Sequence, residues 1–331
     1  MYPTPGGPTY GSFVETQMEA IARAGVKVDV DFVNGRRSSW EYATGLVRVK
    51  RLARLGSFDL VHAHYGLCGF ICSFQALPLV VSYWGDDLLG TPNGRGGLTP
   101  KSRATVLLSR AAAHRADGIN CESEEMRSRL PASIDPKIVH VIPNGVNTSV
   151  FSPGSREAAR QRLGLGGSER LILFPNTPTE RRKRLDLAEA ALRLVQADGI
   201  PGRLWIVQGV RPKDMPDYYR AADCLLLTSD WEGSPNVVKE AICCDLPVVS
   251  VDVGDVRWLL GLTEGSVLVE RDPIAIARGL RQVLIGPKHV NGRRGREELT
   301  IDRVAQSILT VYRKAIARRA AKNQAGLHSA T

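Results

Sequence analysis

Short apolar runs alternate with helical patterns along almost the whole of this 331-residue chain. Such runs lie at 77–83, 171–174 and 224–228, among other places. A short, nearly continuous apolar run is typical of a parallel strand that is buried on both faces. The alternation therefore predicts an α/β fold, with parallel sheets that are covered by helices on both sides.

The series of strands and helices runs through the chain twice. The first series ends near Pro143-Asn144-Gly145, and the second begins with the apolar run at 171–174. A chain of this length can form two domains that each bury a core. We expect one Rossmann-like, doubly wound domain over residues 1–147 and another over 148–310, facing each other across a cleft. A terminal helix, 311–331, is expected to return to the first domain.

The predicted first domain lacks its first strand. Residues 1–11 are rich in Pro and Gly, and a helical pattern at 13–22 and a predicted strand at 26–33 follow this loop. In a doubly wound sheet the missing strand lies near the centre. We therefore expect that the coding start was assigned at an internal methionine, or that the chain is truncated.

Composition places the chain among globular proteins, with 43% hydrophobic and 24% charged residues. No apolar run approaches the roughly 20 residues of a membrane span, and the amino terminus lacks the pattern of a secretory signal. We expect a cytoplasmic protein. Its six cysteines show neither a disulfide framework nor a zinc pattern, which favours reduced, packed thiols.

The net charge of +10 calls for an explanation. A basic cluster at 48–54 lies on a predicted helix whose other face carries apolar residues, namely Leu46, Val49, Leu52, Ala53 and Leu55. This helix lies either on an anionic membrane surface, which would place the protein on the inner face of the membrane, or in solvent as an ordinary charged face. Nucleic acid is not expected as a partner, because the basic residues lack interleaved aromatics and no binding motif is present.

A predicted strand-to-helix junction, W-E-G-S-P-N-V-V-K-E at 231–240, is the strongest candidate site. Ser234 suits a helix N-cap and Pro235 suits the first helical position. That arrangement would leave the N–H groups of Asn236, Val237 and Val238 free at the positive end of a helix. Such an end favours an anion, and a phosphate group above all.

Two glutamates flank this predicted phosphate site. Glu232 precedes the helix, and Glu240 lies almost two turns into it. A ligand with hydroxyls on both sides of a pyrophosphate, such as a nucleotide sugar, would contact both carboxylates. The alternative is a capped helix with two solvated glutamates.

The chain resembles the retaining glycosyltransferases of family 4, which have the two-domain GT-B architecture. Glu232 and Glu240 match the E-x7-E motif of that family, and Lys183 falls at the position of its phosphate-binding lysine. The segment 141–151, V-I-P-N-G-V-N-T-S-V-F, matches the connection between the domains, and 246–256 matches the strand and glycine turn after the motif helix. The resemblance covers almost the whole chain.

The resemblance implies roles for these residues in binding the donor. Lys183 faces the diphosphate, with Arg182 as a substitute, Glu240 holds the ribose, and Glu232 contacts the donor sugar. Gly11 matches a glycine loop near the diphosphate, and backbone at 209–215 contacts the base. The implied donor-binding set is Gly11, Arg182, Lys183, Glu232, Gly233, Ser234, Pro235, Asn236, Val237, Val238 and Glu240.

The acceptor side is assigned to the first domain. Asp87 matches the aspartate of the family's H-G-x-D motif, but Trp84 stands where the histidine is usual. His64 is our best candidate for contact with the acceptor, although a structural histidine is an open alternative. The implied catalytic residues are Glu232, Lys183 and His64.

The resemblance implies transfer of a sugar from a nucleoside diphosphate to a glycan or lipid-linked acceptor, with no metal and no cofactor. The pairs Asp29/Asp31 and Asp86/Asp87 are accordingly interpreted as strand-end and loop aspartates. Two alternatives stay open. The replacement at Trp84 and the missing strand suggest a non-catalytic nucleotide-sugar-binding subunit or a truncated, inactive enzyme, and the same architecture also supports a nucleotide-sugar 2-epimerase.

Overall fold

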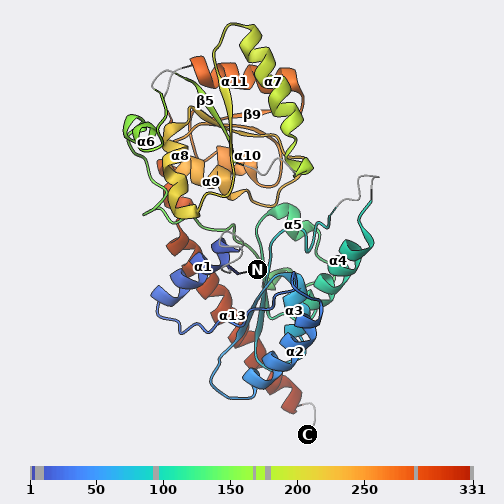
Figure 1. Ribbon diagram of the computed structural model, residues 1–331. Helices are drawn as coiled ribbons and strands as arrows, with labels where there is room; N and C mark the ends of the chain where they lie inside the picture. Colours follow the sequence, from blue (N-terminus) through green and yellow to red (C-terminus); the bar gives the residue numbers. More distant parts are fainter. Residues whose placement is uncertain are drawn as a thin grey trace. The chain divides into compact units, whose positions relative to one another are not determined.

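The computed structural model describes residues 2–3, 11–91, 97–166, 169–175, 180–286 and 290–328 (Figure 1). The chain forms two compact units. Unit 1 comprises residues 1–143 and 304–331, and unit 2 comprises residues 144–303. The predicted boundaries are 147 and 310.

Unit 1 contains a four-stranded parallel sheet in the order β1-β2-β3-β4. Its strands are β1 (Val61–His64), β2 (Leu79–Tyr83), β3 (Gly118–Cys121) and β4 (Val139–Val141). Every residue of β2 and β3 is buried, as expected for central strands that are covered on both faces. The helices of this unit are α1 (Ser12–Arg23), α2 (Trp40–Ala53), α3 (Gly66–Cys72), α4 (Pro100–Ala113) and α5 (Glu124–Ser128), with η1 (Pro136–Ile138).

The prediction of a strand over residues 26–33 is wrong. No strand precedes Val61 among the described residues, and β1 is the edge of the sheet. A strand needs a neighbour for its backbone N–H and C=O groups. Among the described residues, no strand pairs with this segment to supply those hydrogen bonds.

Helix α3 was not predicted, because its two glycines have poor helix propensity. Both permit close packing. A Cβ atom on Gly66 would lie 2.0 Å from Ser109 Oγ, and one on Gly69 would lie 2.8 Å from a methyl group of Val81. Tertiary contacts with α4 and β2 therefore decide the conformation of this segment.

Helix α2 directs much of its apolar face into unit 1. Val49 is buried in the core, and Leu46 packs against that core. The exposed apolar side chains of this segment are Trp40, Val47 and Leu55. Val49 is thus the one buried residue of the predicted apolar stripe, whereas Leu46, Leu52 and Ala53 are half-buried and Leu55 is exposed. The membrane-surface hypothesis stays a prediction. No helix in the described part of the chain is long and apolar enough to cross a membrane.

Unit 2 contains a five-stranded parallel sheet in the order β6-β5-β7-β8-β9. Its strands are β5 (Leu171–Pro175), β6 (Arg203–Val207), β7 (Cys224–Leu227), β8 (Val248–Val251) and β9 (Val267–Val269). The chain winds in one direction from β5 to β6 and in the other from β7 to β9. The point of reversal lies between β5 and β7, where ligands of doubly wound sheets bind at the carboxyl ends of the strands.

The helices of unit 2 cover both faces of this sheet. Leu225 and Leu227 of β7 belong to the apolar core that contains α8 and α9, whereas Cys224 and Leu226 belong to the core that contains α7 and α11. This period of two is that of a strand buried on both faces. The helices are α6 (Arg156–Arg162), α7 (Leu185–Ala197), α8 (Met215–Ala221), α9 (Asn236–Cys243), α10 (Val256–Leu260), α11 (Pro273–Ile285) and α12 (Arg293–Leu299), with η2 (Arg181–Lys183) and η3 (Pro212–Asp214).

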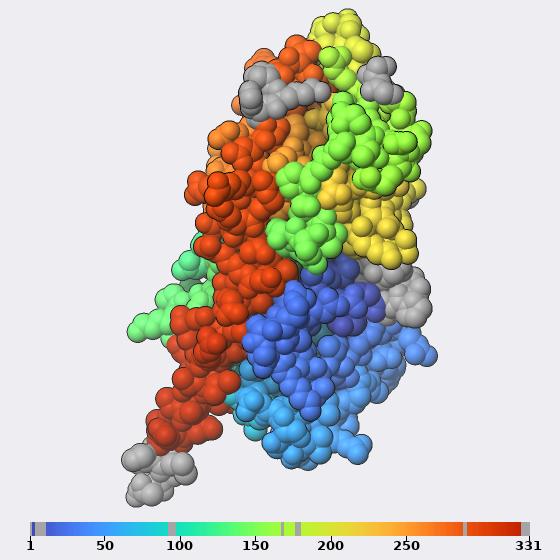
Figure 2. All heavy atoms as spheres, turned by 90° about the vertical axis from the view of Figure 1, so that its left-hand side faces the viewer, coloured from blue at the N-terminus to red at the C-terminus, as the bar shows by residue number. Residues whose placement is uncertain are grey.

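The terminal helix α13 (Ile301–His328) belongs to unit 1 from residue 304 onward, and Figure 2 shows it with α1 on one exposed face of that unit. Asp117 fixes it there. The Asp117 carboxylate has no exposed surface and accepts hydrogen bonds from Arg319 at 2.6 Å and Lys322 at 3.1 Å. Burial alone would raise the pKa of this carboxyl group, but the hydrogen bonds from Arg319, the Leu79 N–H and Lys322 lower it.

We predict that Asp117→Asn loosens α13 by about 2 kcal/mol or more, because Arg319 loses its buried anionic partner. Hydrogen exchange along α13 measures this change. Asp135→Asn is the matched control, since Asp135 forms an exposed ion pair with Arg318 of the same helix. Equal exchange in the two variants would contradict the assignment.

Candidate active site

The predicted site lies in unit 2, at the reversal point of its sheet. Glu232 follows β7, and Lys183 ends the short helix η2 in the connection after β5. Helix α9 begins four residues after Glu232. The site residues therefore occupy the carboxyl ends of the two strands between which the winding reverses.

The segment that carries Lys183 is fixed to the end of β7. The Thr228 hydroxyl donates to the carbonyl oxygens of Lys183 at 2.7 Å and Arg184 at 3.0 Å. The Asp230 N–H donates to the Arg182 carbonyl at 2.7 Å. These bonds hold the backbone of Arg184 in the left-handed region, with φ 53°. Residues other than Gly and Asn rarely adopt this conformation. The position of Lys183 is thus determined by β7.

Glu232 receives three polar partners. Lys183 Nζ donates to its Oε1 at 2.5 Å, Arg182 Nη1 lies at 2.9 Å, and Ser229 Oγ donates at 2.7 Å. Glu232 is buried, and burial alone would raise the pKa of its carboxyl group. The charges of Lys183 and Arg182 overcome burial and lower that pKa, so Glu232 is a carboxylate at neutral pH.

Helix α9 starts one residue later than the Ser234 cap predicts. Ser234 does not cap it, because its hydroxyl donates to Asp255 Oδ2 instead, and Pro235 occupies the N-cap position. The Val238 N–H donates to the Pro235 carbonyl at 3.1 Å, so it is not free as predicted. The N–H groups of Asn236 and Val237 have no partner among the described residues. Two donors therefore remain for an anion at this end.

Gly254, in the turn after β8, lies against the loop that carries Glu232. A Cβ atom on Gly254 would be 2.2 Å from the Gly233 carbonyl oxygen and 2.8 Å from that of Glu232. Its φ of 57° is a second reason for glycine there. The backbone of this turn and the backbone of the loop that carries Glu232 thus lie too close together for any side chain at position 254.

Glu240 lies within α9, where its Oε2 accepts a hydrogen bond of 2.6 Å from the Tyr219 hydroxyl. Burial raises the pKa of Glu240 to about 7, although Tyr219 and the charge of Lys239 act in the opposite direction. Tyr219, on α8, was not predicted as a site residue. Its contact joins residues 21 positions apart, which no local pattern indicates.

A cavity of unit 2, about 840 Å³ in volume, is lined by the loop that was predicted to contact the base. Gly209, Val210 and Arg211 belong to that lining, together with Tyr218. Tyr218 stacks on Trp205, with ring centroids 5.0 Å apart. Contact of this loop with the base stays a prediction.

Two neighbouring histidines of β1, in unit 1, have opposite environments. His62 has a partner at each ring nitrogen, Tyr312 Oη at 2.7 Å and Ser82 Oγ at 2.8 Å. Both ring nitrogens of His64 are buried without a partner among the described residues, and so is Trp84 Nε1. The rings of His64 and Trp84 stack with centroids 5.5 Å apart. The structure thus brings together two of the predicted acceptor-side residues.

Asp87 has a structural task in the same region. Its carboxylate accepts hydrogen bonds from the N–H groups of Gly66, Trp84 and Gly85, at 2.9 to 3.0 Å, and it is fully buried. Burial raises the pKa of Asp87 to about 7. Gly11, of the predicted glycine loop, has φ 76° and is the N-cap of α1. The roles of Asp87 and Gly11 toward substrates stay predictions.

Two family models match the chain. The model described as Glycosyltransferase Family 4 matches residues 5–150, and the model described as Glycosyl transferases group 1 matches residues 175–285. The chain belongs to family 4 of the glycosyltransferases. The predicted family is thereby confirmed, and the chain is an enzyme of the glycosyltransferase class.

Relatives of this family 4 glycosyltransferase agree over most of its length. A D-inositol 3-phosphate glycosyltransferase of Geodermatophilus obscurus is 26% identical, over 86% of this chain and 72% of the relative. Another, of Xylanimonas cellulosilytica, is 28% identical, over 85% and 78%.

Solved structures confirm the GT-B fold. Sucrose-phosphate synthase from Thermosynechococcus elongatus superposes with a TM-score of 0.75 and 18% identity, over 96% of both chains. Anabaena HepE, in complex with UDP, superposes with a TM-score of 0.57 and 16% identity, over 95% of this chain and 89% of that one.

We predict that replacement by Phe lowers the stability of the glycosyltransferase at His62 but changes it little at His64. His62→Phe leaves Tyr312 and Ser82 without their ring partner and lowers the free energy of unfolding by about 1 to 3 kcal/mol. His64→Phe removes two nitrogens that have no partner, so stability changes little. Urea unfolding measures both. A larger loss in His64→Phe would show that its ring nitrogens have partners in the folded protein.

We also predict that Glu240 makes stability depend on pH. Its folded pKa of about 7 lies above the unfolded value near 4.5, so between these values the folded state holds a proton that the unfolded state has lost. Stability therefore falls as pH rises through this window, by about 3 kcal/mol in total. Glu240→Gln removes this fall. Parallel stability curves for the two proteins from pH 4.5 to 8 would contradict the prediction.

Proposed function

We propose that this glycosyltransferase moves a sugar from a nucleoside-diphosphate sugar to a glycan or lipid-linked acceptor, with retention of anomeric configuration and without a metal ion. The observation that carries the proposal is the position of Lys183, Glu232 and the start of α9 at the reversal point of one sheet. A lysine ammonium and two free N–H groups form an anion site, and a carboxylate adjoins it.

The reaction places opposite demands on the two ends of the donor. The bond between the anomeric carbon and the diphosphate oxygen breaks, a bond from that carbon to an acceptor hydroxyl oxygen forms, and the hydroxyl proton passes to the departing diphosphate. Negative charge grows on the leaving group as the anomeric carbon becomes cationic. Groups that stabilise both changes accelerate transfer.

Lys183 and the N–H groups of Asn236 and Val237 suit the leaving diphosphate. In the free protein, Lys183 is held by Glu232. A diphosphate brings more negative charge than one carboxylate, so it competes for the ammonium group. Glu232 retains Arg182 and Ser229 as partners when Lys183 turns to the phosphate.

Glu232 and Glu240 suit the two ring systems of the donor. Glu232, an anion, can accept hydrogen bonds from sugar hydroxyls and favour a cationic anomeric carbon. Glu240 is a candidate for the ribose hydroxyls, with Tyr219 holding one of its oxygens in place. Neither role requires a covalent bond to the enzyme.

The comparisons support the choice of donor. HepE, a neighbour by fold, has been crystallised with UDP and with UDP-glucose. The curated relatives carry the name of an acceptor, D-inositol 3-phosphate, which is a phosphorylated polyol. A nucleotide-sugar donor and a hydroxyl acceptor are therefore the chemistry that we propose for this chain.

The test is binding and turnover with a panel of nucleotide sugars. We predict that the protein binds a nucleoside diphosphate and releases it from one donor, and that Lys183→Ala weakens this binding by about tenfold or more, because a charge-assisted hydrogen bond is lost. Arg181→Ala is the matched control, as an exposed basic neighbour in the same short helix. Calorimetry and diphosphate release give the two readouts.

The products that form distinguish the alternative functions. Binding without release would indicate a non-catalytic subunit, and an altered nucleotide sugar without free diphosphate would indicate an epimerase. Proton NMR of the product reports the anomeric configuration, and inversion would contradict the retaining mechanism. Equal affinities of Lys183→Ala and Arg181→Ala would remove Lys183 from the site.

A further inference from the structure

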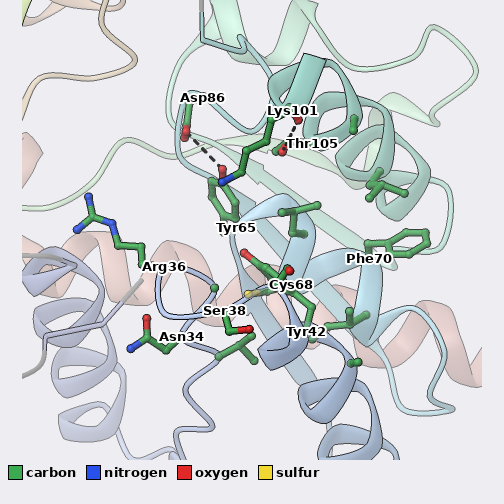
Figure 3. Close-up of a pocket in the computed structure, with 18 of the residues that line it drawn as sticks. Asn34, Arg36, Ser38, Tyr42, Tyr65, Cys68, Phe70, Asp86, Lys101 and Thr105 are labelled. Carbon is green, nitrogen blue, oxygen red and sulfur yellow. Dashed lines mark hydrogen bonds between the residues drawn. The ribbon is translucent and has the colours of Figure 1, made fainter. Parts of the chain in front are cut away.

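Lys239, in the first half of α9, is one of two buried side chains among the described lysines and arginines, and the other is Arg160. Basic side chains elsewhere reach solvent. Arg36 and Lys101, for example, line a cavity of unit 1 and are exposed (Figure 3). An ammonium group loses hydration free energy when it is buried, so a lysine without exposed surface is rare unless other groups hold it.

Lys239 directs its ammonium group back to the start of α9. Side chains on a helix tilt toward its N-terminus, and Lys239 lies three residues after Asn236, the first residue of α9. Lys239 Nζ donates to the Asn144 carbonyl oxygen at 3.1 Å, and Asn144 Nδ2 donates to Asn236 Oδ1 at 3.1 Å. Asn144 thus joins the buried ammonium group to a residue whose N–H faces the anion site.

Asp255 joins Lys239 to the loop before α9 by a second route. Its Oδ2 accepts a hydrogen bond from the Ser234 hydroxyl. Burial raises the pKa of Asp255, whereas the charge of Lys239 and the hydrogen bond from Ser234 act in the opposite direction. The ammonium group therefore favours the ionised form of the carboxylate that holds Ser234.

The charge of Lys239 adds to the positive end of the helix dipole. Acidic side chains are the residues that stabilise a helix start. The first turn of α9 contains none, and no side chain caps this start among the described residues. A buried cation at this end lowers the stability of the free protein and strengthens the attraction for an anion at the Asn236 and Val237 N–H groups.

We propose that Lys239 is a positioning residue for the donor diphosphate. Its ammonium group holds Asn144 and Asp255, and these two residues fix Asn236 and the loop before it. Its charge strengthens the anion site from inside the protein. Lys239 has no exposed surface, so it acts without touching the ligand. The proposal rests on the proposed function, because that function assigns a diphosphate to this helix start.

The experiment measures binding of UDP, ADP and GDP, and of the matching nucleoside monophosphates, to the full chain by calorimetry. Lys239→Met keeps the length of the side chain and removes its charge. We predict that this variant binds the preferred diphosphate about fivefold or more weakly. The loss for the monophosphate is smaller, because that ligand carries less negative charge. Looser packing alone would weaken both ligands equally.

Arg296→Met is the matched control, because Arg296 forms an ion pair of 2.6 Å with Asp245 at the other end of α9. This variant also removes a basic group that holds the helix. We expect it to bind the diphosphate within about twofold of the original protein, even if it loses as much stability as Lys239→Met does. Urea unfolding gives the free energy of unfolding of both variants.

Asn236→Ala tests the same connection without removing a buried charge. It deletes the acceptor of Asn144 Nδ2 and keeps the Asn236 N–H. We predict a loss of about threefold in diphosphate affinity, which corresponds to one hydrogen bond. In Lys239→Met/Asn236→Ala the total loss should be smaller than the product of the two single losses, because both act through Asn144. This variant also tests the proposal if Lys239→Met does not fold.

The proposal is overturned if Lys239→Met binds the diphosphate as tightly as Arg296→Met does, or if its losses for diphosphate and monophosphate are equal. Should Lys239→Met not fold, unchanged affinity in Asn236→Ala overturns it. In these cases the original protein still binds a nucleoside diphosphate, so the proposed function stands. Failure of all three diphosphates to bind the original protein would refute the donor site, and this role of Lys239 with it.

Discussion

The ion pair between Lys183 and Glu232 joins two segments that the sequence separates by 49 positions. Each partner comes directly from the end of a strand or its connection, and the two strands are neighbours in the sheet. The pair forms because Thr228 and Asp230 attach the Lys183 segment to the end of β7. The register of β5 and β7 therefore determines the electrostatics around Lys183 and Glu232, and the apolar cores on both sides of the sheet determine that register.

The two units use the same architecture for different chemistry. In unit 2 the charged groups of Lys183, Arg182 and Glu232 pair with one another before any ligand binds. In unit 1 His64 and Trp84 have buried nitrogens without partners in the described part of the chain. An unsatisfied polar group lowers stability and is retained where it serves binding. The structure thus shows a charged pair in unit 2 that is already formed, and ring nitrogens in unit 1 that have no partner among the described residues.

Much of this arrangement could be predicted from the sequence, and the predictions that failed did so for identifiable reasons. The parallel sheets and the family were predictable, because apolar runs and the E-x7-E spacing are local signals, whereas the predicted strand at 26–33 was wrong. The cap at Ser234 was wrong because Asp255, 21 residues further on, takes its hydroxyl. Tyr219 and α3 were missed for the same kind of reason: a tertiary contact, to Glu240 in one case and to Ser109 in the other, decides what local propensity does not.

The contact between Ser234 and Asp255, with Gly254 lying on the carbonyl of Gly233, has a consequence for how the donor is received. The loop after β7 and the turn after β8 share a hydrogen bond and a close backbone contact, so neither can move without the other. Preorganised surfaces of this kind lose little conformational entropy when a ligand arrives. Selectivity for a ligand at these two loops therefore depends on their fixed shape. Substitution of Gly254 would alter that shape, even though Gly254 has no side chain to contact a substrate.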